Sequence, residues 1–127
     1  MPPEPKVLFV DDEAPMREIL TLFFQGGGIN LTAVATGQEG MEAFCGNQFD
    51  LTILDLNLAG GDCLDVLNFI KDRAPKHPVI VFTGAEDDEL FLKKHLLDRA
   101  QALVRKTSPL KTLLGTTQRL LGENAPR

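Results

Sequence analysis

The sequence has few of the residues that build zinc sites, disulfide frameworks or membrane anchors. Its two cysteines, Cys45 and Cys63, form no CxxC pair, and no charged leader followed by an apolar run opens the chain. We therefore expect free thiols in a cytoplasmic protein that does not enter a membrane. The two histidines, His77 and His95, have no cysteine or histidine neighbours at ligand spacing, which argues against a zinc site.

Basic charge is also scarce. Thirteen lysine and arginine residues stand against eighteen acidic residues, which gives a formal net charge of −5 at pH 7. Domains that bind nucleic acid directly usually have a clustered basic face, so nucleic acid is not an expected direct partner. The length of 127 residues and the mean hydropathy of −0.03 fit one compact domain. We expect a single domain over 1–127, with an ordered core at about 6–121 and flexible ends at 1–5 and 122–127.

What is present is a regular alternation of short apolar stretches and amphipathic stretches. The first apolar stretch, Lys6–Val10, stops at two aspartates and is typical of a buried strand. From 15 to 24 the apolar residues recur at helical spacing, with Pro15 suited to the first turn and three glycines after the pattern ends. The later predicted strands are 31–35, 51–54, 79–82 and 102–104.

A helix is expected after each strand. The later helix starts are marked by Thr36 with Glu39 in a capping-box pattern, by Asp62, by the acids at 86–89, and by Ser108 with Pro109. Five strands alternating with five amphipathic helices predict a doubly wound α/β fold, because right-handed crossovers cover both faces of a parallel sheet. We assign the aromatic and C-terminal apolar side chains to the core: Phe23, Phe44, Phe49, Phe82, Leu110, Leu113, Leu114 and Leu121.

Polar side chains follow four of the predicted strands. Asp11 and Asp12 follow the first strand, Asp55 the third, Thr83 the fourth and Lys106 the fifth. Ligands of a doubly wound sheet bind outside the carboxyl ends of the strands, so these five groups should meet at one edge. Three crowded carboxylates repel one another and require a hard cation, and oxygen ligands favour Mg²⁺. The sequence therefore predicts a magnesium site.

The same groups suit phosphoryl transfer. Beside a cation, the Asp55 carboxylate can stay ionised and attack phosphorus, while the Lys106 ammonium offsets charge on the transferring group. The Thr83 hydroxyl can donate to a phosphoryl oxygen, and Gly84 leaves space for the incoming group. Each residue alone has a simpler explanation, because strand ends commonly have turn residues, helix caps and solvated lysines. Only their joint placement indicates this chemistry.

The order of these residues resembles that of the receiver domains of two-component response regulators, over essentially the whole chain. The stretches LFVDDE and ILDLNL, Thr83 with Gly84, and Lys106 are similar to the family's pattern. The resemblance implies a flavodoxin-like (CheY-like) fold. It also implies that Asp55 accepts a phosphoryl group from a phosphohistidine on a sensor histidine kinase or a histidine phosphotransferase. Such a domain is a phosphoacceptor signalling domain rather than an enzyme, although it catalyses its own phosphorylation and slow dephosphorylation.

Further roles are implied only by this resemblance. Mg²⁺ would be held by Asp12, Asp11, Asp55 and the backbone carbonyl of Asn57, and phosphoryl oxygens would be bound by Thr83 and Lys106. The side chains of Asn57 and Ala85 would tune hydrolysis of the acyl phosphate. The signal would pass to an unidentified downstream protein or output domain, by docking or by homodimerisation on phosphorylation.

The chain departs from the family's pattern in three places. Leu103 stands where the family commonly has tyrosine or phenylalanine, so the usual aromatic switch is absent or altered. Thr107 replaces the proline that usually follows Lys106, and we predict a trans bond there because a cis bond before a non-proline residue costs about 2.5–4 kcal/mol. The loop at 59–63 also differs, and we expect it to be looser.

Two other functions remain open. A haloacid-dehalogenase-like phosphatase could match Asp55, Thr83 and Lys106, but that family has a second aspartate where Asn57 stands, and its further acids follow the lysine. A receiver-like docking module without phosphorylation is suggested by the two departures near Lys106. The retained acids, threonine and lysine favour phosphorylation over both.

Overall fold

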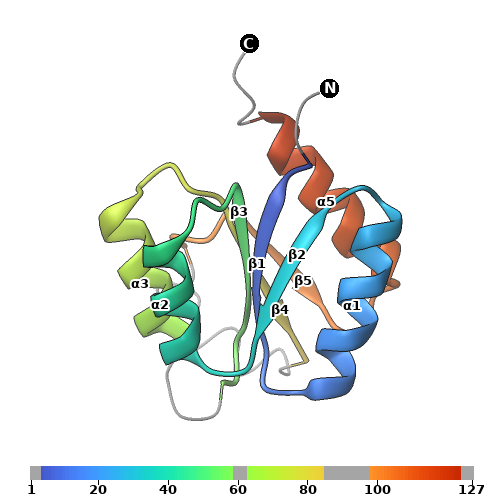
Figure 1. The fold of residues 1–127 in the computed structure, drawn as a ribbon, viewed down its shortest axis with the longest axis horizontal. Coiled ribbons are helices and arrows are strands. Elements are labelled where there is room, and N and C mark those ends of the chain that lie inside the picture. The colour runs from blue at the N-terminus through green and yellow to red at the C-terminus, as the bar shows by residue number, and fades with distance from the viewer. Residues whose placement is uncertain (1–3, 59–62, 85–97, 124–127) are drawn as a thin grey trace.

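The central sheet has five parallel strands in the order β2-β1-β3-β4-β5 (Figure 1). In this computed structural model the described residues are 4–58, 63–84 and 98–123. The strands are β1 (Lys6–Val10), β2 (Asn30–Val34), β3 (Leu51–Asp55), β4 (Val79–Thr83) and β5 (Ala102–Arg105). This strand order is that of flavodoxin-like folds, in which the direction of winding reverses between β1 and β3. The predicted fold class is confirmed.

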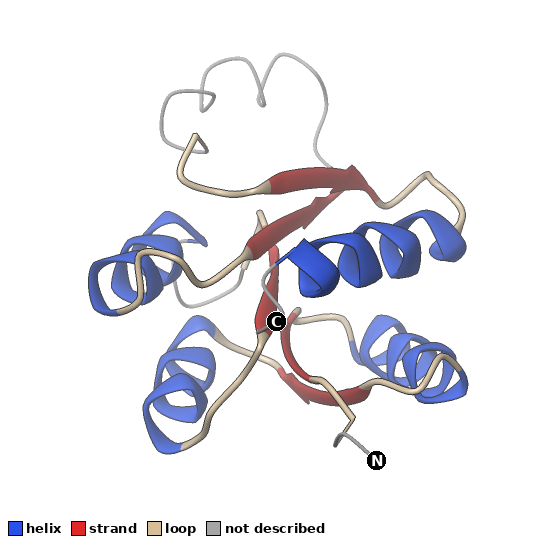
Figure 2. Cartoon of the chain, turned by 90° about the horizontal axis from the view of Figure 1, so that it is seen from above, coloured by secondary structure: helices blue, strands red, loops and turns tan. Residues whose placement is uncertain are grey.

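Helices cover both faces of the sheet, as the view from above shows (Figure 2). The described helices are α1 (Ala14–Gly26), α2 (Gly37–Gly46), α3 (Cys63–Arg73) and α5 (Leu110–Glu123). α1 and α5 lie on one face, and α2 and α3 on the other (Figure 1). None of the helices in this part of the chain is long and apolar enough to cross a membrane. The helix predicted to begin at 86–89 and the predicted cap Asp62 lie outside the described residues.

Side chains alternate along each strand between two hydrophobic cores. On β1, Val7 and Phe9 belong to the core under α1 and α5, whereas Leu8 and Val10 belong to the core under α2 and α3. Every residue of β3 and β4 is buried. Strands covered on both faces are apolar throughout, which is why they appear in the sequence as short continuous runs.

The predicted core of α1 is wrong in part. Its buried residues are Leu20 and Phe24, whereas Phe23 is 37% exposed and Ile19 is 49% exposed. Leu20 and Phe24 are four residues apart and share the inner face of the helix, so Phe23 falls outside it. The other core assignments are confirmed as buried or partly buried: Phe44, Phe49, Phe82, Leu110, Leu113, Leu114 and Leu121.

Element boundaries differ slightly from those predicted, and two of the differences affect the site. Thr36 caps α2 as predicted, because its Oγ1 accepts the Glu39 N–H at 3.1 Å. β3 and β4 extend one residue further than expected, so Asp55 and Thr83 are the last residues of their strands. Ladder hydrogen bonds therefore help to fix the backbone beneath both side chains. α5 continues to Glu123, which lies within the end predicted to be flexible at 122–127.

A buried polar network lies at the amino ends of β3, β4 and β5, at the other end of the strands from Asp55 and Thr83. Lys71 on α3 is 3% exposed, and its ammonium donates to the His77 carbonyl and, at 2.8 Å, to Gln101 Oε1. The Val79 N–H donates to the same Gln101 oxygen at 2.8 Å. His77 Nε2 lies 2.9 Å from Thr52 Oγ1. These hydrogen bonds join α3 to the start of the sheet and satisfy a buried cation.

Candidate functional site

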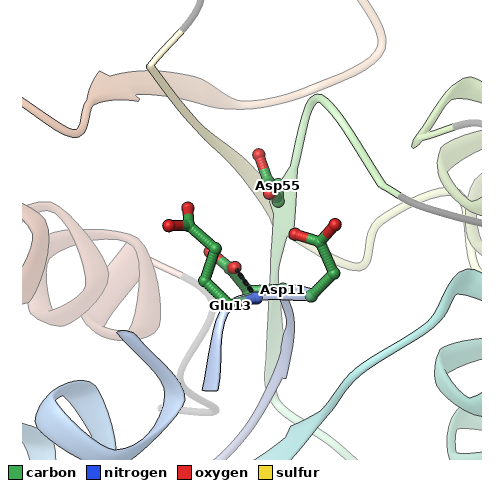
Figure 3. Close-up of side chains that lie close together, drawn as sticks. Asp11, Glu13 and Asp55 are labelled. Carbon is green, nitrogen blue, oxygen red and sulfur yellow. Dashed lines mark hydrogen bonds between the residues drawn. The ribbon is translucent and has the colours of Figure 1, made fainter. Parts of the chain in front are cut away.

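Neighbouring strands bring acidic side chains together at one edge of the sheet. Asp11 directly follows β1, Asp55 ends β3, and the two strands are paired. Both residues are buried, while Asp12 and Glu13 in the loop after β1 are exposed. One carboxylate oxygen from each of these four residues lies within 4.8 Å of the others. Figure 3 shows Asp11, Glu13 and Asp55 around the same space.

Hydrogen bonds hold the backbone of the first loop in place. The Asp11 N–H donates to the Val34 carbonyl at 3.1 Å, which continues the pairing of β1 with β2. The Asp11 carbonyl accepts from Arg17 Nη1 at 2.8 Å. Asp11 Oδ1 accepts the Glu13 N–H, also at 2.8 Å, as the dashed line in Figure 3 marks. Asp11 is therefore fixed both at its backbone and at one carboxylate oxygen.

The Lys106 ammonium lies among three of the carboxylates. Its Nζ is 2.9 Å from Asp11 Oδ2, 3.0 Å from Glu13 Oε1 and 3.4 Å from Asp55 Oδ2. A lysine after β5 thus reaches residues that follow β1 and end β3. The convergence predicted for these strand ends is present in the structure.

The base of Lys106 is set by its neighbours on β4. Its backbone N–H donates to the Thr83 carbonyl at 2.7 Å, and its Nζ lies 5.7 Å from the centroid of the Phe82 ring. A Cβ on Gly84 would lie 3.9 Å from Lys106 Cδ, so the stem passes beside this glycine. The bond to Thr107 is trans, as predicted. The lysine therefore reaches the carboxylates without the cis bond usual in similar sequences.

Burial and charge shift the protonation of both partners. Burial is the largest effect on Asp55 and raises its pKa to about 6, although the Asn57 N–H at 3.2 Å and the Lys106 charge lower it. Burial lowers the pKa of Lys106, but its contacts with Asp11 and Glu13 outweigh burial and raise the pKa above its usual value. Lys106 therefore stays protonated and positively charged, and Asp55 is mostly ionised at neutral pH.

The carboxylate oxygens of this site suit a hard divalent cation. Asp11 Oδ2 is buried and accepts no hydrogen bond from the described residues, although Lys106 pairs with it as an ion. Within the described part of the chain, this buried carboxylate oxygen has only the ammonium as a charged partner, and it faces the oxygens of Asp12 and Asp55. Carboxylate oxygens from Asp11, Asp12 and Asp55 are the ligands that Mg²⁺ prefers. The carbonyl of the exposed Asn57 stays a predicted fourth ligand.

The remaining predicted residues differ in how far the structure places them. Thr83 is buried at the end of β4, one residue beyond the register partner of Asp55, and the role of its hydroxyl stays a prediction. Leu103 lies on β5 and is 40% exposed. Ala85 lies outside the described residues. Glu13 received no role from the sequence, and the only signal for it was its place as the third acid of the run LFVDDE.

A five-stranded parallel sheet with an acidic, lysine-containing site at its carboxyl edge defines the class of protein: a doubly wound α/β domain with a cluster of carboxylates around a buried aspartate. The family model for the response regulator receiver domain matches residues 7–118. The chain therefore belongs to the family of response regulator receiver domains, and it is a signalling domain of two-component systems.

Individual relatives agree with this assignment. Response regulator protein PilR of Pseudomonas aeruginosa is 31% identical over an alignment of 137 positions. The alignment covers 95% of this chain and 31% of PilR. Transcriptional activator protein PfeR of the same species is 36% identical over 90 residues, covering 69% of this chain and 29% of PfeR. The chain thus spans less than a third of the length of these relatives.

Solved structures share the fold. Response regulator protein TrrA from Thermotoga maritima, in complex with Mg²⁺ and BeF, has a TM-score of 0.83 at 25% identity, and the match covers 91% of this chain and 98% of that chain. A CheY-like receiver domain protein from Methanospirillum hungatei has a TM-score of 0.84 at 22% identity, covering 94% of each chain.

Proposed function

We propose that this receiver domain accepts a phosphoryl group onto Asp55 from a phosphohistidine, with the help of Mg²⁺, and that phosphorylation changes its conformation. The main observation is the placement of Asp55. Its carboxylate ends β3 at the edge where ligands of doubly wound folds bind, with Lys106 Nζ 3.4 Å from Oδ2.

The chemistry of Asp55 follows from its surroundings. Its pKa of about 6 lies below neutral pH, so most molecules have an ionised nucleophile at pH 7. One carboxylate oxygen forms the new bond to phosphorus, while the P–N bond of the donor breaks and its electron pair stays on the leaving imidazole. The Lys106 ammonium offsets negative charge on the transferring group. The Asn57 N–H stabilises the other oxygen, Oδ1, at 3.2 Å.

The acids of the first loop would hold the metal ion together with Asp55. The buried Asp11 and the exposed Asp12 would each supply a carboxylate oxygen, with the Asn57 carbonyl as a further ligand. When bound, Mg²⁺ supplies positive charge that offsets the charge of the phosphoryl oxygens. The Thr83 hydroxyl would donate to one of these oxygens once the group is on Asp55.

The partners we propose follow from the family. The autoinducer 1 sensor kinase/phosphatase LuxN of Vibrio harveyi is 26% identical over 112 residues, which cover 87% of this chain but only 13% of LuxN. We propose a sensor histidine kinase or a histidine phosphotransferase as donor, and a downstream protein or output domain as receiver of the signal. We also propose a cytoplasmic location for this single domain, with homodimerisation as one means of output.

Intact-mass measurement after incubation with acetyl phosphate tests the proposal directly. We expect an adduct of one phosphoryl group that requires Mg²⁺ and is lost in Asp55→Asn. Asp65→Asn is a matched control because Asp65 is an exposed acid in the first turn of α3, and it should keep the adduct. Failure of the wild type to form an adduct or to bind beryllofluoride would instead favour the docking module without phosphorylation.

A further inference from the structure

Lys106 pairs with two kinds of carboxylate. Asp11 and Asp55 are buried and belong to the proposed set of Mg²⁺ ligands, whereas Glu13 lies outside that set and its side chain is 62% exposed. We propose that Glu13 is a positioning residue for Lys106: it holds the ammonium at the rim while Mg²⁺ takes the inner carboxylates. The inference deepens the proposed function and rests on it.

The backbone of Glu13 is fixed, so the direction of its side chain is limited. Its N–H donates to Asp11 Oδ1 at 2.8 Å, and its carbonyl accepts the Arg17 N–H at 3.1 Å. Glu13 is the N-cap residue of α1, yet its side chain makes no capping hydrogen bond. The side chains that usually accept a hydrogen bond from the first turn are the shorter Ser, Thr, Asp and Asn. Here the carboxylate instead pairs with Lys106.

Lys106 is fixed at its base and needs a counter-charge at its tip. Its N–H is bound to the Thr83 carbonyl at 2.7 Å, and its stem passes beside Gly84. Its side chain is only 14% exposed. A cation that is largely buried is costly to leave unpaired. The ammonium can therefore leave Asp11 and Asp55 readily only if another anion stays within its reach.

Binding of Mg²⁺ creates this need. If Asp11 and Asp55 held a divalent cation, their oxygens would no longer be available to the ammonium, and Lys106 would be repelled by the metal charge. With Glu13 present, the ammonium keeps its contact at 3.0 Å. Without Glu13, Lys106 either stays on the inner carboxylates and competes with the metal, or loses every anionic partner. Both results weaken Mg²⁺ binding.

The exposure of Glu13 also suits the later step. Ion pairs that water reaches are weak, so Lys106 can leave Glu13 at little cost when phosphoryl oxygens become available. A buried acid in this place would retain the ammonium more strongly. Glu13 thus provides a temporary partner for Lys106 between the metal-free protein and the phosphorylated protein.

Calorimetric titration of the metal-free protein with Mg²⁺ tests this role. We expect Glu13→Gln to weaken Mg²⁺ binding about two- to fivefold, the range of an exposed ion pair. Lys106→Met should bind Mg²⁺ at least as tightly as the wild type, because a competing cation is gone. In the Lys106→Met background, Glu13→Gln should have little further effect, because Glu13 acts through the lysine.

A charge-matched control separates this role from the general electrostatic effect of an acidic side chain near the metal. Glu18 is an exposed acid on α1 that lies outside the cluster of carboxylates, so Glu18→Gln should leave Mg²⁺ affinity unchanged. The ¹⁵N resonance of the Lys106 ammonium provides a second readout. In the wild type it should stay observable when Mg²⁺ is added, and in Glu13→Gln it should broaden as the unpaired ammonium exchanges with water.

The outcomes distinguish the two proposals. An affinity equal in wild type and Glu13→Gln would overturn the role of Glu13 alone, and so would a loss that persists in the Lys106→Met background. The latter result would mean that Glu13 acts on the metal directly. Absence of Mg²⁺ binding by the folded wild type would overturn both the role of Glu13 and the proposed function.

Discussion

Gly40 on α2 packs directly against Val10 on β1, and this contact allows a quantitative prediction. A Cβ built on Gly40 would lie 2.8 Å from Val10 Cγ2, well inside the separation of about 3.5–4.0 Å at which carbon atoms attract. Val10 is fully buried at the end of β1, next to Asp11. Because Val10 is β-branched and enclosed, its methyl group has little room to move away.

The size of the effect follows from two opposing terms. Replacing glycine by alanine within a helix stabilises it by about 1 kcal/mol, and overpacking a filled core costs about 1–3 kcal/mol. Gly115 on α5 separates the two terms, because a Cβ there meets nothing within 4 Å. We expect Gly40→Ala to be less stable than Gly115→Ala by about 1–3 kcal/mol, since the gain in helix propensity largely cancels in this comparison.

Urea unfolding followed by far-ultraviolet circular dichroism is the suitable assay, because the chain has no tryptophan or tyrosine to report by fluorescence. A change in midpoint at constant slope gives the stability difference. Val10→Ala should cost less stability in the Gly40→Ala background than in the wild type, because it removes the clashing methyl groups. Equal stabilisation by Gly40→Ala and Gly115→Ala would refute the reasoning from close packing.

Two further predictions concern stability. Burial, followed by the Lys71 charge, lowers the pKa of His77 from 6.5 to about 4, although Asp50 raises it. The unfolded chain therefore binds this proton more tightly, so the stability that His77 contributes is complete above about pH 6.5 and declines as the pH falls toward 4, by up to about 3 kcal/mol. Urea titrations from pH 7 to 4 should show that the free energy of unfolding declines less in His77→Gln than in the wild type. An equal decline in the two proteins would contradict the assignment. The raised pKa of Asp55 acts in the opposite direction, but both proteins share this effect. Thr36→Ala removes the cap of α2 and should lower stability by about 1 kcal/mol in the same assay, whereas an unchanged midpoint would show that the cap contributes nothing.

The sheet could be predicted closely because its signal is local. Each strand is a short apolar run, and β3 and β4 are buried along their whole length. The inner face of α1 could not be predicted as well, because apolar residues extend well beyond the buried face of this helix. Leu22 is 70% exposed and Phe23 is 37% exposed, while Phe24 beside them is fully buried. Packing against the sheet and α5 decides which of them is covered.

The site was predictable only where strand ends determine it. The rule that ligands bind at the carboxyl ends of parallel strands is enough to predict that Asp11, Asp55 and Lys106 lie together. The pair of Glu13 and Lys106 joins residues 93 positions apart. It depends on the conformation of the loop after β1 and on how far the Lys106 side chain extends. No sequence pattern predicts either of these.

The two cores described above share the strands but no side chains. A substitution that changes the volume under α1 and α5 alters residues such as Phe9 and Leu113, while the residues packed under α2 and α3, such as Val10 and Leu67, stay in place. The sheet therefore separates the domain into two compartments that can diversify independently. A lineage can remodel one helical surface for new recognition while the other layer continues to support the ends of β1 and β3.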